Sequence, residues 1–484
     1  MNLREILHII GALLMWTAAA MAPPIVFAAS EGLLVPWLVT ALITAVVGLG
    51  LWRLTPREVS INPREGVAIV GLGWIAVVLA GSLPFIITGT APTIPAAIFE
   101  SVSGFTTTGA TVFPVIEELP KSILLWRSIT HWLGGMGIIV LGVAILPLLG
   151  MGGAQLFRAE APGIPSERLR PRIASTARSL WVVYGVLTGT LAVIYLLLGM
   201  SVFDAVNHAM SCLATGGFST KTSSIRDFSS AIQWVTILFM ILAGTNFTLH
   251  FRFAMGRWMS PFRDEEWRWY LGIMAFCWLV VVASLVTAGD ELLTGELIRR
   301  AMFNVTAINT TTGFATTDFT LWPTLAQVIL LGLMFMGAMG GSTGGGFKTV
   351  RSGVVLKHIA GEIRKVLHPQ AVVVTKLGGR AIRPEVLHNV LAFLALYMLT
   401  HGLGTVVLAS LGQYDLVTAL SASLAALSSI GPGLGDVGPV SHYGIMTPMA
   451  HLVLSMLMLL GRLEFYTLLV LVAPGTWIRS GGDR

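Results

Sequence analysis

Long uncharged, apolar runs separated by short basic segments dominate the pattern of hydrophobic and polar positions along the chain. A helix that spans the hydrocarbon core of a bilayer, which is roughly 30 Å thick, needs about 20 apolar residues. Runs of that length lie at or within residues 6–30, 33–52, 66–99, 128–150, 179–203, 228–251, 269–289, 325–347, 386–413 and 443–471. The pattern therefore predicts an all-α membrane protein with about ten spans.

Short uncharged segments rich in Thr, Ser and Gly form an internal repeat within this pattern. Its four copies read FESVSGFTTTGA (99–110), VNHAMSCLATGG (206–217), FNVTAINTTTGF (303–314) and SASLAALSSIGP (421–432). Aligned on Gly109, Gly216, Gly313 and Gly431, they are 107, 97 and 118 residues apart. Each copy lies between two apolar runs, so the predicted unit is span, short segment, span.

We divide the chain by this repeat. Residues 1–58 are predicted to form two N-terminal transmembrane helices. Repeats 1 to 4 are residues 59–150, 151–258, 259–365 and 366–484. Their pore loops are residues 96–113, 203–220, 299–318 and 416–438, in the same order.

Each short segment is too short to cross a bilayer. About ten helical residues before its glycine reach roughly 15 Å, half the hydrocarbon core. The chain must then return in a non-helical form, which is tolerated at that depth only where protein buries it or a watery cavity faces it. Four such returns around one axis form a ring of carbonyl oxygens that can replace the hydration shell of an ion. Two alternatives are ordinary extracellular loops and small-residue helix packing, but four copies in register favour re-entry.

Composition and charge support membrane insertion. The chain has 484 residues, 55% hydrophobic and 11% charged, whereas soluble domains carry about 25% charged residues. A net charge of +6 is compatible with nucleic-acid binding. However, 23 Lys and Arg residues lie on one side of the predicted spans and 6 on the other. This asymmetry predicts cytoplasmic termini, and we expect no nucleic-acid partner.

The four motifs SGFTTTGAT, LATGGFSTKTSS, NTTTGFATTDF and GPGLGDVGP resemble the pore loops of the TrkH/KtrB superfamily of potassium transporters. The resemblance covers nearly the full chain, and the two additional N-terminal spans are closer to the TrkH branch. It implies four pseudo-symmetric, potassium-channel-like M1-P-M2 repeats and K⁺ uptake through a bacterial or archaeal cytoplasmic membrane. It also implies a homodimer and a cytoplasmic nucleotide-binding regulatory subunit of the TrkA type, with no organic cofactor in this chain.

By position, the resemblance implies a K⁺ selectivity filter that acts mostly through backbone carbonyls. Its residues would be Thr107, Thr108, Gly109, Ala214, Thr215, Gly216, Thr311, Thr312, Gly313, Ser429, Ile430 and Gly431.

A glycine-rich stretch, GAMGGSTGGGFKT (337–349), falls within the predicted second span of repeat 3. Each glycine weakens a helix by about 1 kcal/mol relative to alanine, so the helix should break here. We predict a mobile loop below the filter that gates flow, as the resemblance also implies. Its residues are Gly340, Gly341, Ser342, Thr343, Gly344, Gly345, Gly346 and Lys348. The alternatives are close helix packing and, for Lys348, a simple interface anchor.

Arg462 lies near the middle of the last apolar run. A charge at that depth is costly unless it is paired or solvated. We expect it to face the pore below the filter and to repel a resting cation. The alternative is a structural ion pair with another repeat. Glu464 is two positions away and so cannot share a helix face with Arg462.

Two competing functions have different sequence signatures. An ion-coupled symporter of the alternating-access type, driven by H⁺ or Na⁺, would usually show inverted repeats, but these four copies share one orientation. A membrane enzyme would need paired carboxylates, a nucleophile with its base, or a histidine cluster inside the membrane. The apolar runs offer only Arg462 and Glu464, so we expect no enzyme.

Overall fold

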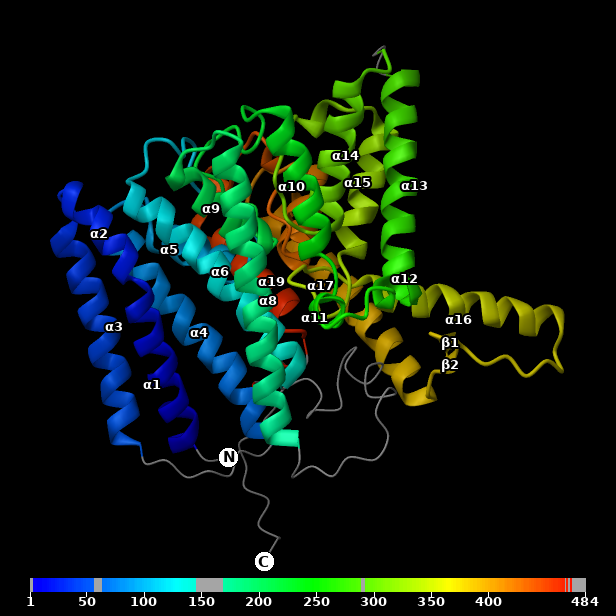
Figure 1. The fold of residues 1–484 in the computed structure, drawn as a ribbon, viewed down its shortest axis with the longest axis horizontal. Helices are drawn as coiled ribbons and strands as arrows, with labels where there is room; N and C mark the ends of the chain where they lie inside the picture. The colour runs from blue at the N-terminus through cyan, green and yellow to red at the C-terminus, as the bar shows by residue number, and fades with distance from the viewer. Residues whose placement is uncertain are drawn as a thin grey trace, which may run out of the picture.

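The fold is a bundle of helices that mostly run between two opposite ends of the molecule (Figure 1). The computed structural model describes residues 3–55, 63–144, 169–288 and 292–465, together with 467, 468 and 471. Helices α1, α4, α8 and α13 all run upward in Figure 1 from their first residues; we call the side on which these helices begin the basal end, and the opposite side the outer end.

The N-terminal part contains α1 (Leu3–Ala20), α2 (Ala22–Ser30) and α3 (Leu34–Leu54). Helices α1 and α3 pack with their backbones in close approach. A Cβ on Gly11 would lie 2.6 Å from the carbonyl oxygen of Gly48. Small residues permit this kind of contact, which is typical of membrane helices.

Four units follow, each with a long first helix, a short helix and a second helix. The first helices are α4 (Pro63–Ile87), α8 (Leu169–Leu197), α13 (Glu265–Ala288) and α17 (Pro384–Leu411). The short helices are α5 (Ile94–Phe105), α9 (Val202–Leu213), α14 (Gly295–Asn309) and α18 (Leu416–Ser428). The second helices are α6 (Lys121–Ala144), α10 (Ser230–Ala243) with α11 (Phe247–Ala254), α15 (Thr324–Met336) with α16 (Thr349–Leu367), and α19 (Pro448–Arg462).

This architecture confirms the predicted fold class. Within the described ranges, six helices are long and apolar enough to cross a membrane, and the bent pair α10 and α11 would be a seventh. The expected number of about ten spans therefore stays a prediction.

The short helices start in the same way in all four units. A side-chain oxygen at the N-cap accepts a hydrogen bond from a backbone N–H of the first turn, which satisfies one of the free donors at a helix start. The four capping residues are Thr93, Ser201, Thr294 and Asp415.

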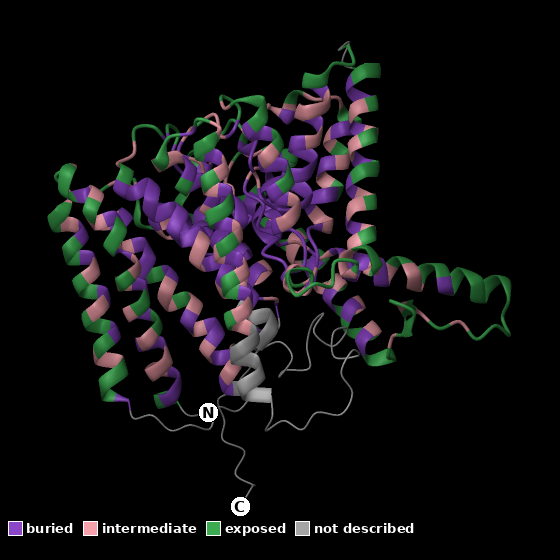
Figure 2. Cartoon of the chain, viewed as in Figure 1, coloured by how far each residue is buried: buried purple, intermediate pink, exposed green. Residues whose placement is uncertain are grey.

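The four units close into a circle. Each short helix contacts the two other helices of its own unit and also the second helix of the preceding unit: α9 with α6, α14 with α10, α18 with α15, and α5 with α19. The last contact joins the fourth unit to the first. Buried residues therefore gather around the short helices, whereas the outer helices expose much of their surface (Figure 2).

Three of the second helices are interrupted. Between α10 and α11 the chain bends by 98°, a break that the sequence analysis did not anticipate. Residues 337–348 separate α15 from α16, as predicted. After α19 the chain leaves the helical conformation, since Glu464 has φ +53°.

Helix α16 projects sideways from the basal end (Figure 1). It leads into a two-residue antiparallel pair, β1 (Lys376–Leu377) and β2 (Arg380–Ala381). The described residues also include the short elements α12 (Ser260–Arg263) and the 3₁₀ turns η2 (Phe319–Leu321), η3 (Gly435–Val437) and η4 (Tyr443–Ile445).

Candidate ion-conducting site

Each short helix ends in the same unusual backbone turn. One residue adopts a left-handed conformation, and the glycine two positions later also has a positive φ. The first positions are Thr107, Thr215, Thr311 and Ser429, with φ of 54°, 53°, 57° and 55°. The glycines are Gly109, Gly217, Gly313 and Gly431, with φ of 83°, 81°, 74° and 98°. Because positive φ is uncommon outside glycine, this fourfold recurrence shows one shared conformation.

The residue between these two positions makes the same hydrogen bond in every unit. Its N–H donates to a carbonyl five residues earlier: Thr108 to Ser103 at 2.9 Å, Gly216 to Ser211 at 2.9 Å, Thr312 to Ala307 at 2.8 Å, and Ile430 to Ala425 at 3.0 Å. The bond closes the end of each short helix and turns the chain back toward the outer end.

The structure corrects the predicted register in the second unit. The equivalent of Gly109 is Gly217, not Gly216. Ala214 lies one position before the turn, where it forms the C-cap of α9. Two adjacent glycines leave the sequence alignment ambiguous here, and the predicted position, Gly216, is one residue too early. Gly216 lacks a side chain for a local reason, since a Cβ there would lie 2.3 Å from Nδ1 of His131.

The four turns form a closed ring. A Cβ built on Gly109 would lie 1.9 Å from the carbonyl oxygen of Gly216. The same relation continues around the circle, from Gly217 to the oxygen of Thr312 at 2.1 Å, from Gly313 to that of Ile430 at 1.9 Å, and from Gly431 to that of Thr108 at 2.7 Å. The carbonyl of the middle residue of each turn therefore lies beside the glycine of the neighbouring unit. We call these twelve residues (107–109, 215–217, 311–313 and 429–431) the carbonyl ring.

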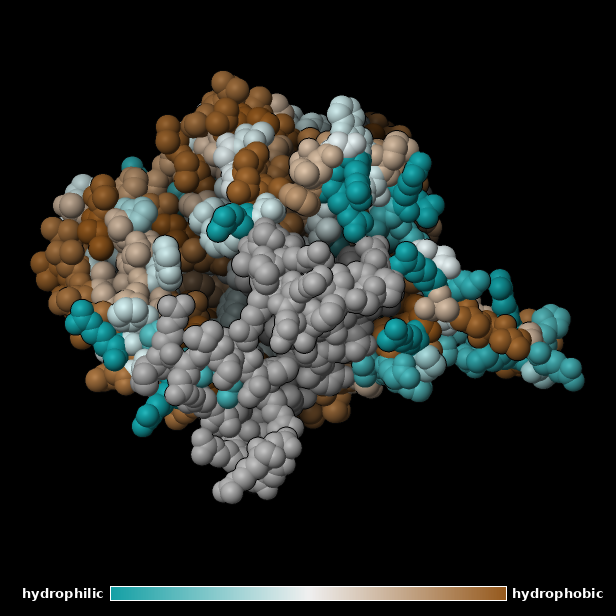
Figure 3. Space-filling model, turned by 60° about the horizontal axis from the view of Figure 1, so that its bottom comes forward, coloured by the Kyte–Doolittle hydropathy of each residue, from teal (hydrophilic) through white to brown (hydrophobic). Residues whose placement is uncertain are grey.

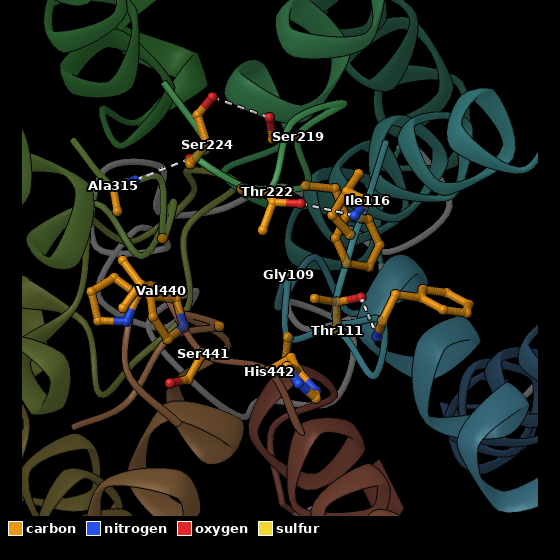
Figure 4. A pocket seen from close by; sticks show the side chains of 18 of the residues that line it. Gly109, Thr111, Ile116, Ser219, Thr222, Ser224, Ala315, Val440, Ser441 and His442 are labelled. Carbon is orange, nitrogen blue, oxygen red and sulfur yellow. Dashed lines mark hydrogen bonds between the residues drawn. The ribbon is translucent and has the colours of Figure 1, made fainter. Parts of the chain in front are cut away.

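A cavity of about 660 Å³, counted with its open mouth, lies directly outside the carbonyl ring. All four positive-φ glycines line it. Figure 4 shows loops from every unit around its open centre, including Thr111, Ser219, Ala315 and His442. The four short segments thus converge on one central line.

Hydrogen bonds between units hold the loops around this cavity. The N–H of Ile116 donates to Thr222 Oγ1 at 2.9 Å, and the N–H of Ala315 donates to Ser224 Oγ at 3.2 Å (Figure 4). On the opposite side, the N–H of Tyr443 donates to the carbonyl of Thr111 at 2.8 Å.

Charged and titratable groups lie near the outer mouth. Lys221 and His442 line the cavity. The carboxylate of Glu117 accepts hydrogen bonds from the N–H and hydroxyl of Thr222. Partial burial acts to raise the pKa of Glu117, but these hydrogen bonds outweigh it and lower the pKa below 4.5. Glu117 is therefore anionic at neutral pH and offers a weak attraction for cations.

A polar side chain from each short helix holds the returning chain of its own unit, and the sequence analysis missed this feature. Glu100 accepts from the N–H of Val112 at 3.0 Å, His208 Nε2 bonds Ser219 Oγ at 2.9 Å, Asn304 Nδ2 donates to Thr316 Oγ1 at 3.2 Å, and Ser421 Oγ accepts from the N–H of Leu434 at 2.8 Å. These bonds fix the backbone directly behind the carbonyl ring.

Glu100 also forms a buried ion pair. Its Oε1 accepts from Arg127 Nε at 2.7 Å, and both side chains are almost fully buried. The guanidinium of Arg127 lies 3.9 Å from the ring centre of Phe218, which follows Gly217. Charge counting alone places Arg127 among the six Lys and Arg residues on the side of the spans opposite the predicted cytoplasmic termini, and it does not predict this ion pair. The available signal was Glu100, an acidic residue inside an otherwise uncharged repeat segment.

The glycine-rich loop (residues 337–348) lies just below the carbonyl ring. The N–H of Gly345 donates to Thr311 Oγ1 at 2.6 Å. Thr343 Oγ1 donates to the carbonyl of Leu213, the last residue of α9, at 3.0 Å. A Cβ on Gly345 would lie 2.1 Å from the carbonyl oxygen of Ser428, at the end of α18. The loop therefore reaches the basal side of the ring in at least three units.

Arg462 and Lys348 both bind this loop. Arg462 Nη1 donates to the carbonyl of Thr343 at 2.8 Å, and Lys348 Nζ donates to the carbonyl of Gly344. Arg462 is 3% exposed. The neighbouring carboxylate, Glu464, forms its ion pair with Arg351, at 2.7 Å. Arg462 and Glu464 thus have different partners.

The donor set of the carbonyl ring suits a monovalent cation. Backbone carbonyls and hydroxyls are neutral oxygen ligands, and a ring of them can substitute for hydration water. The C-terminal ends of the short helices, which carry partial negative charge, point at the same region. Among the described residues, no group of three or more His, Cys, Asp or Glu side chains is placed to hold a metal ion.

Comparison with known proteins now identifies the class. The family model TrkH, described as a cation transport protein, matches residues 38–477. The chain therefore belongs to the TrkH family of cation transport proteins, and it is a transport protein rather than an enzyme.

Individual relatives match over the full length. The Trk system potassium uptake protein TrkH of Vibrio parahaemolyticus is 40% identical over 487 residues, which cover 99% of this chain and 100% of that protein. The protein of that name from Escherichia coli strain K12 is 38% identical, with the same coverage. The crystal structure of the potassium transporter TrkH from Vibrio parahaemolyticus superposes with a TM-score of 0.90 at 38% identity, over 99% of this chain and 100% of the other. The chain is accordingly a multi-pass membrane protein.

Proposed function

We propose that this protein carries K⁺ across the cytoplasmic membrane through a central pore, with the carbonyl ring as its selectivity filter. The observation that carries the proposal is the closed circle of four positive-φ glycines, each beside a carbonyl oxygen of the next unit. The relatives named as potassium uptake proteins support K⁺ as the transported ion. In the second unit the filter residues are Thr215, Gly216 and Gly217, so Ala214 is not among them.

We further propose that the glycine-rich loop is the gate. It lies immediately below the carbonyl ring and is hydrogen-bonded to three of the units. Arg462 supports the closed position in two ways, because it binds the carbonyl of Thr343 and places a positive charge beside the cation path. Lys348 acts from within the loop through its bond to Gly344.

The wider assembly follows the family resemblance. We propose a homodimer with a cytoplasmic nucleotide-binding subunit of the TrkA type, and termini at the cytoplasmic, basal end. The excess of Lys and Arg in segments assigned to that end supports this orientation. The repeat boundaries given from the sequence are part of the same proposal.

The test of the pore is flux of ⁸⁶Rb⁺ and ²²Na⁺ into proteoliposomes. We expect Gly109→Ser and Gly313→Ser to stop Rb⁺ uptake or to lower its preference over Na⁺. A serine Cβ at either position meets a backbone oxygen at 1.9 Å. If both variants fold and transport like the wild type, the filter assignment is wrong. A saturable dependence of Rb⁺ uptake on a H⁺ or Na⁺ gradient would instead favour a coupled symporter.

The test of the gate uses the same vesicles. Deletion of residues 340–345 should raise Rb⁺ flux, since it removes the obstruction below the ring. Arg462→Ala should also raise flux, whereas Arg462→Lys should change it less because the charge remains. A folded deletion variant that conducts at the wild-type rate would exclude the loop as the gate.

A further inference from the structure

An exposed segment that carries five large apolar side chains and two arginines joins the second and third units. Residues 253–264, which we call the strap, read FAMGRWMSPFRD and connect α11 to α13 through α12. Its large apolar side chains are exposed: Phe253 by 49%, Met255 by 70%, Trp258 by 67%, Met259 by 57% and Phe262 by 55%. Arg257, between Met255 and Trp258, and Arg263, directly after Phe262, are also exposed.

The strap lies where a membrane boundary is expected. It links the basal ends of two helices of the bundle, α10–α11 and α13 (Figure 1). The 98° bend before α11 turns the chain across the direction of α10, so α11 leads sideways toward the surface. In Figure 3, which brings the basal end forward, hydrophilic side chains gather on the side from which α16 projects, while hydrophobic ones cover the sides of the bundle.

From this composition and position we infer that the strap binds anionic lipid headgroups of the cytoplasmic leaflet. Trp, Phe and Met side chains are stabilised by the acyl boundary, and arginine pairs with the phosphates above it. The strap is continuous with membrane helices at both ends, so a bilayer is always beside it. A protein partner would leave five large apolar side chains in water whenever it dissociated, and we therefore commit to lipid.

The two helices that flank the strap, α11 and α13, both contact the glycine-rich loop. Before it, the N–H of Phe247 donates to the carbonyl of Gly341 at 3.0 Å. After it, the carboxylate of Glu266 accepts from the N–H of Gly340 at 2.6 Å. Adjacent residues of the loop are thus held by the two helices that the strap joins. Lipid bound to the strap fixes both contacts and keeps the loop in its blocking position. This part of the inference rests on the proposed gate.

The first experiment measures lipid contact without transport. We would place an environment-sensitive fluorophore on Trp258→Cys and reconstitute the protein with brominated phosphatidylcholine or brominated phosphatidylglycerol. Cys212 and Cys277 are buried, and the chain without the added cysteine reports background labelling. We expect stronger quenching by the anionic lipid, and loss of that preference in Arg257→Gln/Arg263→Gln. Quenching by aqueous iodide instead of lipid would indicate a protein-docking surface and overturn the inference.

The second experiment measures coupling to the gate. Rb⁺ flux should be lower in vesicles containing phosphatidylglycerol than in pure phosphatidylcholine, and Arg257→Gln/Arg263→Gln should remove the difference. Each arginine near an anionic surface contributes about a fivefold preference, so the upper limit for two is about 25-fold. Arg53→Gln, at the exposed basal end of α3, is the control and should keep the lipid dependence.

The outcomes separate this inference from the proposed function. If deletion of residues 340–345 raises flux but the strap variant keeps the lipid dependence, the gate stands and the coupling is refuted. If the deletion has no effect on flux while the probe still prefers anionic lipid, the gate is refuted and the lipid site stands.

Discussion

Substitution of Gly217 by alanine tests the register and the tightness of the carbonyl ring together. Gly217 has φ +81°, a conformation that costs a non-glycine residue about 1–2 kcal/mol. Its Cβ would lie 2.1 Å from the carbonyl oxygen of Thr312, whereas real Cβ contacts essentially never fall below 3.0 Å. The oxygen must therefore retreat by about 0.9 Å, and overpacking of this kind costs a further 1–3 kcal/mol or so.

The consequence for transport should be larger than the consequence for stability. A ring of oxygens that replaces hydration water depends on the positions of all its members. Displacement of a working group by about 1 Å can lower a rate on the order of 100-fold. We expect Gly217→Ala to reduce ⁸⁶Rb⁺ uptake by that order, with the apparent melting temperature lowered by several degrees.

Two controls make the experiment decisive. Gly332 lies on α15 with no atom within 4 Å of a built Cβ, so Gly332→Ala should fold and transport normally. Ala214 lies directly before the turn of the second unit, and the fourth unit has Ser428 at the equivalent position. The variant Ala214→Ser should therefore retain selective Rb⁺ uptake. A folded Gly217→Ala protein with wild-type flux and selectivity would refute the ring geometry.

Three further predictions follow from neighbouring contacts. Gly216→Ala should impair Rb⁺ uptake because its Cβ would meet the ring of His131 at 2.3 Å, and the double variant with His131→Ala should recover part of the flux; equal flux in the single and double variants would contradict this. Glu100→Gln leaves the buried charge of Arg127 without its partner, so thermal unfolding should show a loss of about 3–5 kcal/mol. Partial burial lowers the pKa of His442 below 6.5, so its charge appears only as the external pH falls below that value; uptake should then decrease by repulsion at the mouth, and His442→Gln should remove that pH dependence.

The chain pattern was sufficient to predict the architecture. The apolar runs are long enough to span a bilayer, and they predicted the transmembrane helices. The four Thr/Gly segments are too short to span it, and they predicted re-entry to half its depth. The break at residues 337–348 was predictable from glycine content. The bend at residues 244–246 was not, because a single glycine in an apolar run is equally compatible with a continuous helix.

The details of the site depended on contacts between distant segments. His131, which comes from a different unit and lies 85 residues earlier, leaves no room for a side chain at Gly216, and so both adjacent positions are glycine. The pairing of Glu100 with Arg127 requires knowledge of how α5 packs against α6. Local helix and turn propensities contain no information on either contact. The sequence therefore predicted the correct segments, but placed the turn of the second unit one residue too early.

Within the part of the chain that the structure describes, the glycine-rich loop occurs in one unit of the four, between α15 and α16. A channel assembled from four identical subunits would have to carry any such element in quadruplicate, and its opening would depend on how many copies had moved. In the present molecule one covalent chain supplies the whole circle, and the proposed gate is a single segment of that chain. Each pore should therefore open in a single step, without intermediate conductance levels. One substitution in that segment should alter the gating of every pore, because each pore contains one copy of the segment.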